Sequence, residues 1–321
     1  MSTFSRVLRV ELIRLRRRRA VLVIAAAILL VPLAIGGLVA WNSRPLSDGE
    51  RAEAAAQAQR DLQECIQHPR RWGAPRAADA ERFCTRNIDP SPEWYIYRPT
   101  LDLRSDQTEG GAAAALVVIA LALLAGTTFI GHDWASGSVS NQLLFTPRRV
   151  PVWLAKAVAL AVTALAWAAV SLTAYWLLLG AVAARRDLPV GDGVLLDCLQ
   201  MGWRAAVVAA GAAVGGYALT MLLRSTVGAL GVIAAVAVAG GIVLAATGFS
   251  GALNPATNVD AVLRDGTRYW VDLPCGSPED VDNNCGREEL RTLGQGAGYL
   301  GSGLVVVALG SVWSFRRRDV P

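Results

Sequence analysis

The sequence has little of what enzymes and metalloproteins usually need. It contains two histidines and five cysteines, without C-x-x-C or H-E-x-x-H spacing, so we expect no metal site. No G-x-x-x-x-G-K-[ST] segment occurs, which excludes ATP binding in a P-loop of this chain. A single lysine, Lys156, stands among 31 basic residues. These absences predict a protein that is not an enzyme and has no cofactor of its own.

Charge is also scarce in six long apolar stretches of a sequence that is 53% hydrophobic. Runs of this length are typical of membrane-spanning helices. We therefore predict an all-α integral membrane protein with six transmembrane helices, at residues 20–41, 112–130, 152–183, 203–223, 226–247 and 296–315. Lys156 lies near one end of the third helix and is expected to snorkel toward the headgroups. Because intramembrane charges usually mark ion or proton pathways, their scarcity argues against a proton-coupled transporter or an ion channel. A pathway through these helices, if there is one, would be apolar and would suit an amphipathic or lipophilic cargo.

The charges outside these stretches predict an orientation. The flanking and connecting segments are residues 1–19, 42–111, 131–151, 184–202, 248–295 and 316–321. The first, third and last of them, with Arg224, hold 13 arginines against three acids, whereas 42–111 holds 10 basic and 12 acidic residues. By the positive-inside rule both termini and 131–151 are cytoplasmic, and the two large segments, 42–111 and 248–295, are extracytoplasmic. The net charge of +5 is then a topology signal, and nucleic acid is not an expected partner.

Residues 1–19 are expected to form an amphipathic helix. Its apolar residues fall on one arc, which Glu11 interrupts, and arginines occupy the opposite arc. Two interpretations stay open: a helix lying on an anionic membrane surface, or a simple arginine cluster that orients the first span. The residues assigned to this interfacial helix are Arg6, Arg9, Glu11 and Arg14.

Four cysteines lie in the segments predicted to be extracytoplasmic, where disulfides persist. More than one pairing is possible. We favour Cys65 with Cys84 and Cys275 with Cys285, because each bond then closes a loop within one segment.

The stretch from Gly131 to Arg149 is too polar for lipid, yet it contains the apolar triplet Leu143, Leu144 and Phe145. Gly131 and Gly137 allow turns into and out of a short helix, and Pro147 is expected to stop that helix. The triplet would fit the groove of a partner protein. The alternative is an ordinary loop whose apolar patch lies on the membrane.

This stretch resembles the permease subunit of ABC exporters, in the ABC transporter type-2 permease family. The matching residues are Gly131, Asp133, Gly137, Ser138, Leu143, Leu144, Pro147, Arg148, Arg149 and Lys156. Asp133 stands where the family usually has Glu, and Ser138 where it usually has Thr. The segment Val10–Arg16 resembles the family's first helix. Six spans and a long polar segment before the last span also match, whereas the large segment 42–111 is an elaboration.

The resemblance implies a function and partners. Two permease subunits, identical or paralogous, would pair in the lipid of a bacterial plasma membrane, each docked on a separate ATPase that binds ATP and magnesium. The coupling residues would be Gly131, His132, Asp133, Gly137, Ser138, Leu143, Leu144, Phe145, Pro147, Arg148 and Arg149. The segment before the last span would close the exit, with Phe249, Leu253, Asn254 and Pro255 as the extracellular gate. The cargo would be drug-, lipid- or peptide-like. The alternative function is a membrane-anchored interaction or sensor protein that acts through its extracytoplasmic segments.

Overall fold

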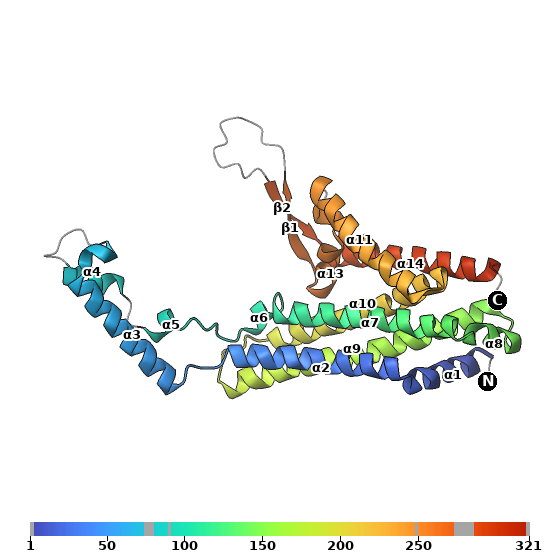
Figure 1. Ribbon diagram of the computed structural model, residues 1–321, viewed down its shortest axis with the longest axis horizontal. Coiled ribbons are helices and arrows are strands. Elements are labelled where there is room, and N and C mark those ends of the chain that lie inside the picture. The colour runs from blue at the N-terminus through green and yellow to red at the C-terminus, as the bar shows by residue number, and fades with distance from the viewer. Residues whose placement is uncertain (1–2, 74–79, 89–90, 248–249, 273–285, 319–321) are drawn as a thin grey trace, which may run out of the picture. The chain divides into compact units, whose positions relative to one another are not determined.

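The structure, a computed structural model, is 82% helical (Figure 1). It describes residues 3–73, 80–88, 91–247, 250–272 and 286–318. The chain divides into two compact units. The larger comprises Met1–Gly36 and Leu103–Pro321, and the smaller comprises Gly37–Asp102. The larger unit is thus assembled from two parts of the chain, and the smaller is an insertion between them.

Six helices are long and apolar enough to cross a membrane. They are α2 (Arg19–Asn42), α7 (Gly110–Ala135), α9 (Arg149–Arg185), α10 (Val194–Leu223), α11 (Thr226–Thr247) and α14 (Leu293–Arg317). Each predicted span corresponds to one of them, so the expectation of a mainly helical, multi-pass membrane protein is confirmed at this coarse level. The side on which each connection lies stays a prediction.

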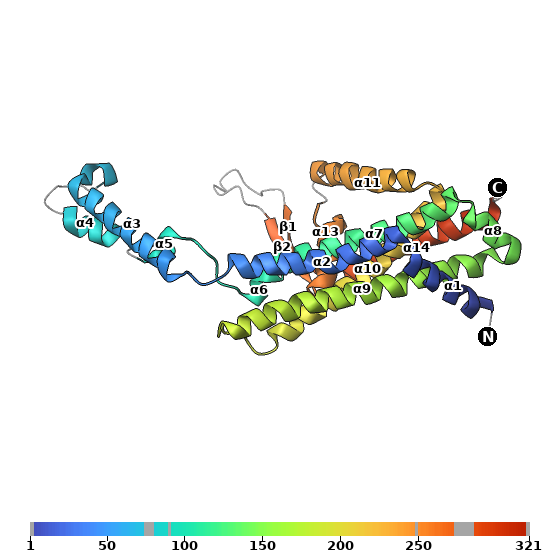
Figure 2. The same cartoon turned by 60° about the horizontal axis from the view of Figure 1, so that its bottom comes forward.

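Close packing of small residues joins α7 to α10, which also packs against α9 and α14 (Figure 2). A Cβ added at Gly126 would lie 2.0 Å from the carbonyl oxygen of Ala213, and one at Gly216 would lie 2.5 Å from that of Leu123. The two backbones therefore approach so closely that a side chain at either glycine would force them apart.

Two helix boundaries differ from the predicted ones. α7 continues to Ala135, so Gly131 is helical and does not form the predicted turn; its role is close contact, since a Cβ there would lie 1.6 Å from Oγ1 of Thr226. α10 begins at Val194, within the segment that we predicted to be a loop. Val194 and Cys198, one turn apart, are both buried, and Sγ of Cys198 donates to the carbonyl oxygen of Leu103, so this first turn packs inside the protein.

Short helices gather at one end of the larger unit, with the C-terminal end of α14 (Figures 1 and 2). α1 (Thr3–Arg17) packs against α9. α8 (Ser138–Phe145) joins α7 to α9. Gly137, with φ of +67°, starts α8 in a left-handed conformation that glycine adopts without strain. The predicted turn at Gly137 is therefore confirmed.

The connection before α14 contains helices and a β-hairpin. α12 (Ser250–Leu253) and α13 (Pro255–Leu263) precede β1 (Thr267–Asp272), which pairs antiparallel with β2 (Gly286–Arg291). The hairpin departs from the all-helical prediction. β1 reads T-R-Y-W-V-D, rich in the β-branched and aromatic residues that favour strands.

The smaller unit contains α3 (Asp48–Gln67), the 3-10 helix η1 (Pro69–Trp72), α4 (Ala80–Asn87) and α5 (Pro92–Tyr95). A disulfide joins Cys65 to Cys84, which confirms that predicted pairing, and Leu62, Phe83 and Ile88 pack around it. Cys275 and Cys285 lie outside the described residues.

Candidate functional site

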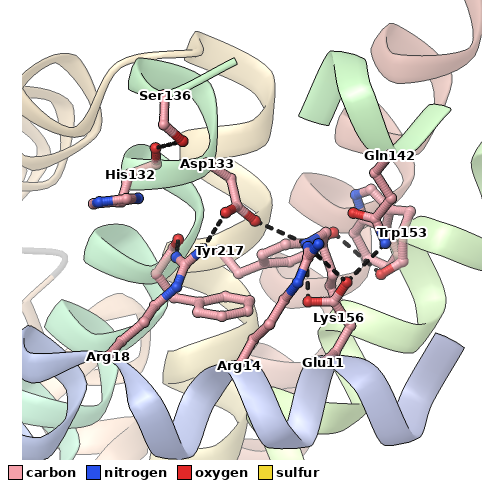
Figure 3. Close-up of polar contacts among 11 residues, drawn as sticks. Glu11, Arg14, Arg18, His132, Asp133, Ser136, Gln142, Trp153, Lys156 and Tyr217 are labelled. Atoms are coloured by element: carbon pink, nitrogen blue, oxygen red, sulfur yellow. Dashed lines mark hydrogen bonds and ion pairs between the residues drawn. The ribbon is translucent and has the colours of Figure 1, made fainter. Parts of the chain in front are cut away.

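A buried group of charged side chains lies where α1, α7 and α9 meet (Figure 3). Nζ of Lys156 on α9 lies 2.9 Å from Oε2 of Glu11 on α1 and 2.7 Å from Oδ2 of Asp133 on α7. Arg18, which follows α1, donates to Oδ1 of Asp133. We call these four residues the charge cluster.

Three residues of the charge cluster are sealed from solvent, and the side chain of the fourth, Arg18, is 20% exposed. Glu11 and Asp133 are fully buried, and Lys156 is 1% exposed. Arg14 lies 3.6 Å from Glu11 at the rim, and the ring of Phe129 lies beneath the guanidinium of Arg18, 4.7 Å away. Removing one partner of such a buried pair typically costs about 3–5 kcal/mol, because it leaves an uncompensated charge. The cluster therefore holds the three helices in one arrangement.

Lys156 was expected to snorkel to the membrane surface, and that prediction is wrong. Its ammonium group points inward, between two carboxylates that are 145 and 23 residues away along the chain. Pairing with both acids stabilises the charge in the interior, so the side chain has no need of the headgroups.

α8 connects directly to this cluster. Nε2 of Gln142 donates to Oε1 of Glu11 at 2.7 Å. Leu143 packs against the neighbouring apolar core, whereas Leu144 and Phe145 are 79% and 89% exposed. The predicted apolar triplet is therefore divided: one residue anchors α8, and two form an exposed tip. We call Leu144 and Phe145 the α8 tip.

The remaining predicted coupling residues have different surroundings. Arg149 donates to the carbonyl oxygens of Phe315 and Arg318, at 2.9 and 2.6 Å, and so closes the C-terminal end of α14. Arg148 is exposed at the N-cap position of α9. Pro147 follows the end of α8, as predicted.

Two other predicted residues do not join the charge cluster. His132 is exposed and points away from it (Figure 3), and its carbonyl oxygen accepts a hydrogen bond from Oγ of Ser136. Ser138 is the first residue of α8.

α1 is held against the protein. Leu8, Leu12 and Leu15 pack on the same core as α9, and Glu11 lies among them because it pairs with Lys156. Neither of the two sequence interpretations included this packing. Arg6 and Arg9 are exposed, as are Val10 and Ile13, at 46% and 47%. This exposed outer face is the part of α1 that is free to contact a membrane surface.

Sequence reasoning missed Gln142, Tyr217 and Trp153. The hydroxyl of buried Tyr217 donates to the carbonyl oxygen of Trp153, and their rings lie 5.2 Å apart. This contact fixes α10 against α9 beside the charge cluster. No sequence pattern identifies Gln142, because its role depends on a carboxylate 131 residues away.

The predicted gate residues belong to a separate region. Asn254 caps α13: its Oδ1 accepts from the amide of Ala256, and Pro255 follows at the first helical position. The carbonyl oxygen of Leu253, half-exposed, accepts from the hydroxyl of Tyr299. Phe249 lies outside the described residues.

Among the described residues, no group of three or more His, Cys, Asp or Glu is placed to hold a metal ion. Comparison with family models, curated proteins and solved structures gives no significant match. The relation to ABC permeases therefore stays a prediction from the sequence.

Proposed function

We propose that this chain is the permease subunit of an ATP-driven ABC exporter in a bacterial plasma membrane, and that a separate ATPase binds the α8 tip. The observation that carries the proposal is the combination of an exposed tip and a buried anchor on one short helix. Leu144 and Phe145 project outward, while Gln142, on the same helix, bonds to the charge cluster.

An exposed pair of large apolar side chains suits a protein partner. A short helix that presents such residues can enter an apolar groove on another protein. The tip lies close in sequence to Arg148 and Arg149, and Arg149 donates to the carbonyl oxygens of Phe315 and Arg318 at the end of α14. By the positive-inside rule this end is cytoplasmic, where ATP is available.

The disulfide supports the same orientation. The Cys65–Cys84 bond lies in the segment between the first two spans. Disulfides persist on the oxidising side of a membrane, which supports an extracytoplasmic position for that segment. Crossing one span then returns the chain to the cytoplasm at α8.

Movement at α8 has a defined path into the spans. Gln142 contacts Glu11, Glu11 contacts Lys156, and Lys156 contacts Asp133. The path thus joins α8 to α1, α9 and α7. Because leaving any of these charges unpaired is costly, a force on α8 moves the helices together. Two such permeases, each with its ATPase, would move an amphipathic or lipophilic cargo outward.

The test is to place a charge on the tip. In Leu144→Asp we expect binding of the ATPase to weaken by at least about 2 kcal/mol, the size of an interface hot spot. The measurement is ATP hydrolysis that co-purifies with the tagged chain from native membranes, with a photo-cross-linker at position 145 to identify the partner. Leu144→Met is the matched apolar control, and Ser136→Asp adds the same charge at an exposed position outside α8.

A second variant separates binding from coupling. Gln142→Leu keeps the tip but removes the hydrogen bond to Glu11, so we expect the ATPase to bind while hydrolysis is stimulated less. Wild-type hydrolysis in a well-inserted Leu144→Asp variant would contradict the proposal. It would favour the alternative, a membrane-anchored protein that acts through its extracytoplasmic segments.

A further inference from the structure

An apolar cavity of about 490 Å³ lies on the side of α10 that faces α14. Its walls come from α7, α10, α11, α13 and α14, and they include Leu123, Gly211, Gly215, Val262 and Leu304. Gly211 and Gly215 form the G-x-x-x-G pattern of α10, which usually marks close helix contact. Here a Cβ at either glycine would meet Leu304 only at ordinary contact distance, 3.6 and 3.7 Å. The two glycines leave space open.

A second cavity, of about 370 Å³, lies between α7, α13 and β1. Val259 of α13 lines both cavities. Leu116 of α7 lines the second cavity, and Ile119 and Leu123 line the first. These three residues follow one face of α7 at helical spacing. The two cavities therefore adjoin at Val259 along one face of α7, and we call them together the trough.

The lining of the first cavity is apolar, whereas the second cavity combines apolar residues with a group of charged and polar side chains. Its α13 end is lined by Asp260, Arg264, Thr267 and Arg268. Asp260 and Arg264 pair with each other, and Thr267 bonds to both. The side chain of Arg268 is 76% exposed, and within the described residues its ion pair is the surface contact with Glu288, at 3.3 Å. The lining of this end therefore has an excess of one positive charge.

We propose that the trough binds one phospholipid from the surrounding membrane, with an acyl chain in the apolar cavity and the phosphate group at Arg268. A cavity of this size is in the range that holds small ligands, ~300–1,000 Å³. A helix with its side chains is about 10–12 Å wide and rises about 5.4 Å per turn, so a helix of a second copy would fit for only about one turn. Arginine favours phosphate oxygens. The site does not depend on the chain being an exporter.

The test uses phosphatidylglycerol that carries a photoactivatable diazirine on its acyl chain, in nanodiscs that hold the full-length chain. We expect label on the peptides of α10 and α14 that line the trough. Gly215→Leu fills the apolar cavity and should lower that label about tenfold. Label on exposed α11 residues such as Val236 reports lipid that only surrounds the protein, and it should not change. Gly298→Leu, at a glycine of α14 with open space around it, is the matched control.

The polar end has its own variant. Arg268→Gln should lower the labelling of the trough by phosphatidylglycerol roughly twofold to fivefold, as for an exposed charged contact. Arg287→Gln, on the other strand of the hairpin and outside the trough, should leave it unchanged. Equal labelling of the trough in Gly215→Leu and the wild type would overturn the proposal. So would an unlabelled trough together with loss of self-association in Gly215→Leu, because a second copy would then be the occupant.

Discussion

The two sides of α10 are built on opposite principles. On the side that faces α9, Tyr217 packs against Trp153 beside a cluster of paired, buried charges. On the side that faces α14, Gly211 and Gly215 leave an apolar cavity of about 490 Å³. An unpaired buried charge is far more costly than an unfilled apolar surface. In a membrane the difference is larger still, since lipid tails are as apolar as leucine and can cover such a surface.

The comparison indicates that the side of α10 facing α9 is held in one arrangement, whereas the packing on the side facing α14 can change. On the charged side, paired charges hold α1, α7 and α9 in one arrangement. The hydrogen bond from Gln142 to Glu11 connects α8 to them. The described side chains that line the apolar cavity carry no polar groups, so they offer no directional bonds. The proposed function, in which movement at α8 reaches a lipophilic cargo, would use both kinds of contact.

The largest effect is expected from breaking the charged side. Lys156→Met leaves Glu11 and Asp133 buried without their shared cation, and we expect a loss of about 3–5 kcal/mol in the free energy of unfolding. Thermal unfolding of the purified protein in detergent measures the effect. The triple variant with Glu11→Gln and Asp133→Asn should recover part of the loss, because no carboxylate is then buried without its lysine, and the guanidinium of Arg18 that loses Asp133 is partly exposed. A single variant as stable as the wild type would show that the cluster is not buried as described.

Two adjacent glycines of α10 sharpen the comparison. A methyl group at Gly216 would lie 2.5 Å from the carbonyl oxygen of Leu123, whereas one at Gly215 would lie 3.7 Å from Leu304. Gly216→Ala should therefore destabilise the fold by about 1–3 kcal/mol, and Gly215→Ala should stay within about 0.5 kcal/mol of the wild type. The same unfolding measurement compares them. Equal effects of the two substitutions would mean that the α14 side is packed as tightly as the α7 contact.

The smallest effect on stability is expected from Glu50 and Arg98, a partly exposed ion pair that contrasts with the buried charge cluster. In the smaller unit, hydrogen bonds from Arg98 and from Ser47, the N-cap of α3, lower the pKa of Glu50 from 4.5 to about 2. Because the folded-state pKa is depressed, the stabilisation is fully present above about pH 4.5 and is lost as the pH falls toward 2. Hydrogen exchange of α3, corrected for its intrinsic pH dependence, should show this loss.

Two variants and added salt complete that measurement. Glu50→Gln should remove the pH dependence, whereas Glu53→Gln, at an exposed position of the same helix, should keep it. Salt should weaken the exposed pair. Protection of α3 that is constant from pH 6 to pH 2 would contradict the assignment.

The sequence predicted the six long helices, the local disulfide, the turn at Gly137 and the end of the short helix before Pro147. Each of these depends on neighbouring residues. It did not predict the β-hairpin, the early start of α10 or the helical position of Gly131. The composition of β1 favours a strand, but its pairing with β2 and the packing of Gly131 against Thr226 involve residues farther along the chain.

The candidate site was predicted in part. The segment that carries it was found, because an apolar triplet in a polar connection is visible in sequence. Only the structure showed that Leu143 faces inward while Leu144 and Phe145 face outward.

By itself, the sequence determined where the spanning helices lie, since apolar runs of sufficient length have few alternatives to a helix in a membrane. Only the tertiary structure decided the place of its charges. The ammonium group of a lysine near a helix end can lie among the lipid headgroups or in the protein interior. Which position Lys156 takes depends on whether carboxylates from other helices pair with it. Glu11 and Asp133 do so from helices that are distant in sequence. Burial of Lys156, Glu11 and Asp133 is favourable only when all three are buried together. No pattern among neighbouring residues in the sequence predicts this.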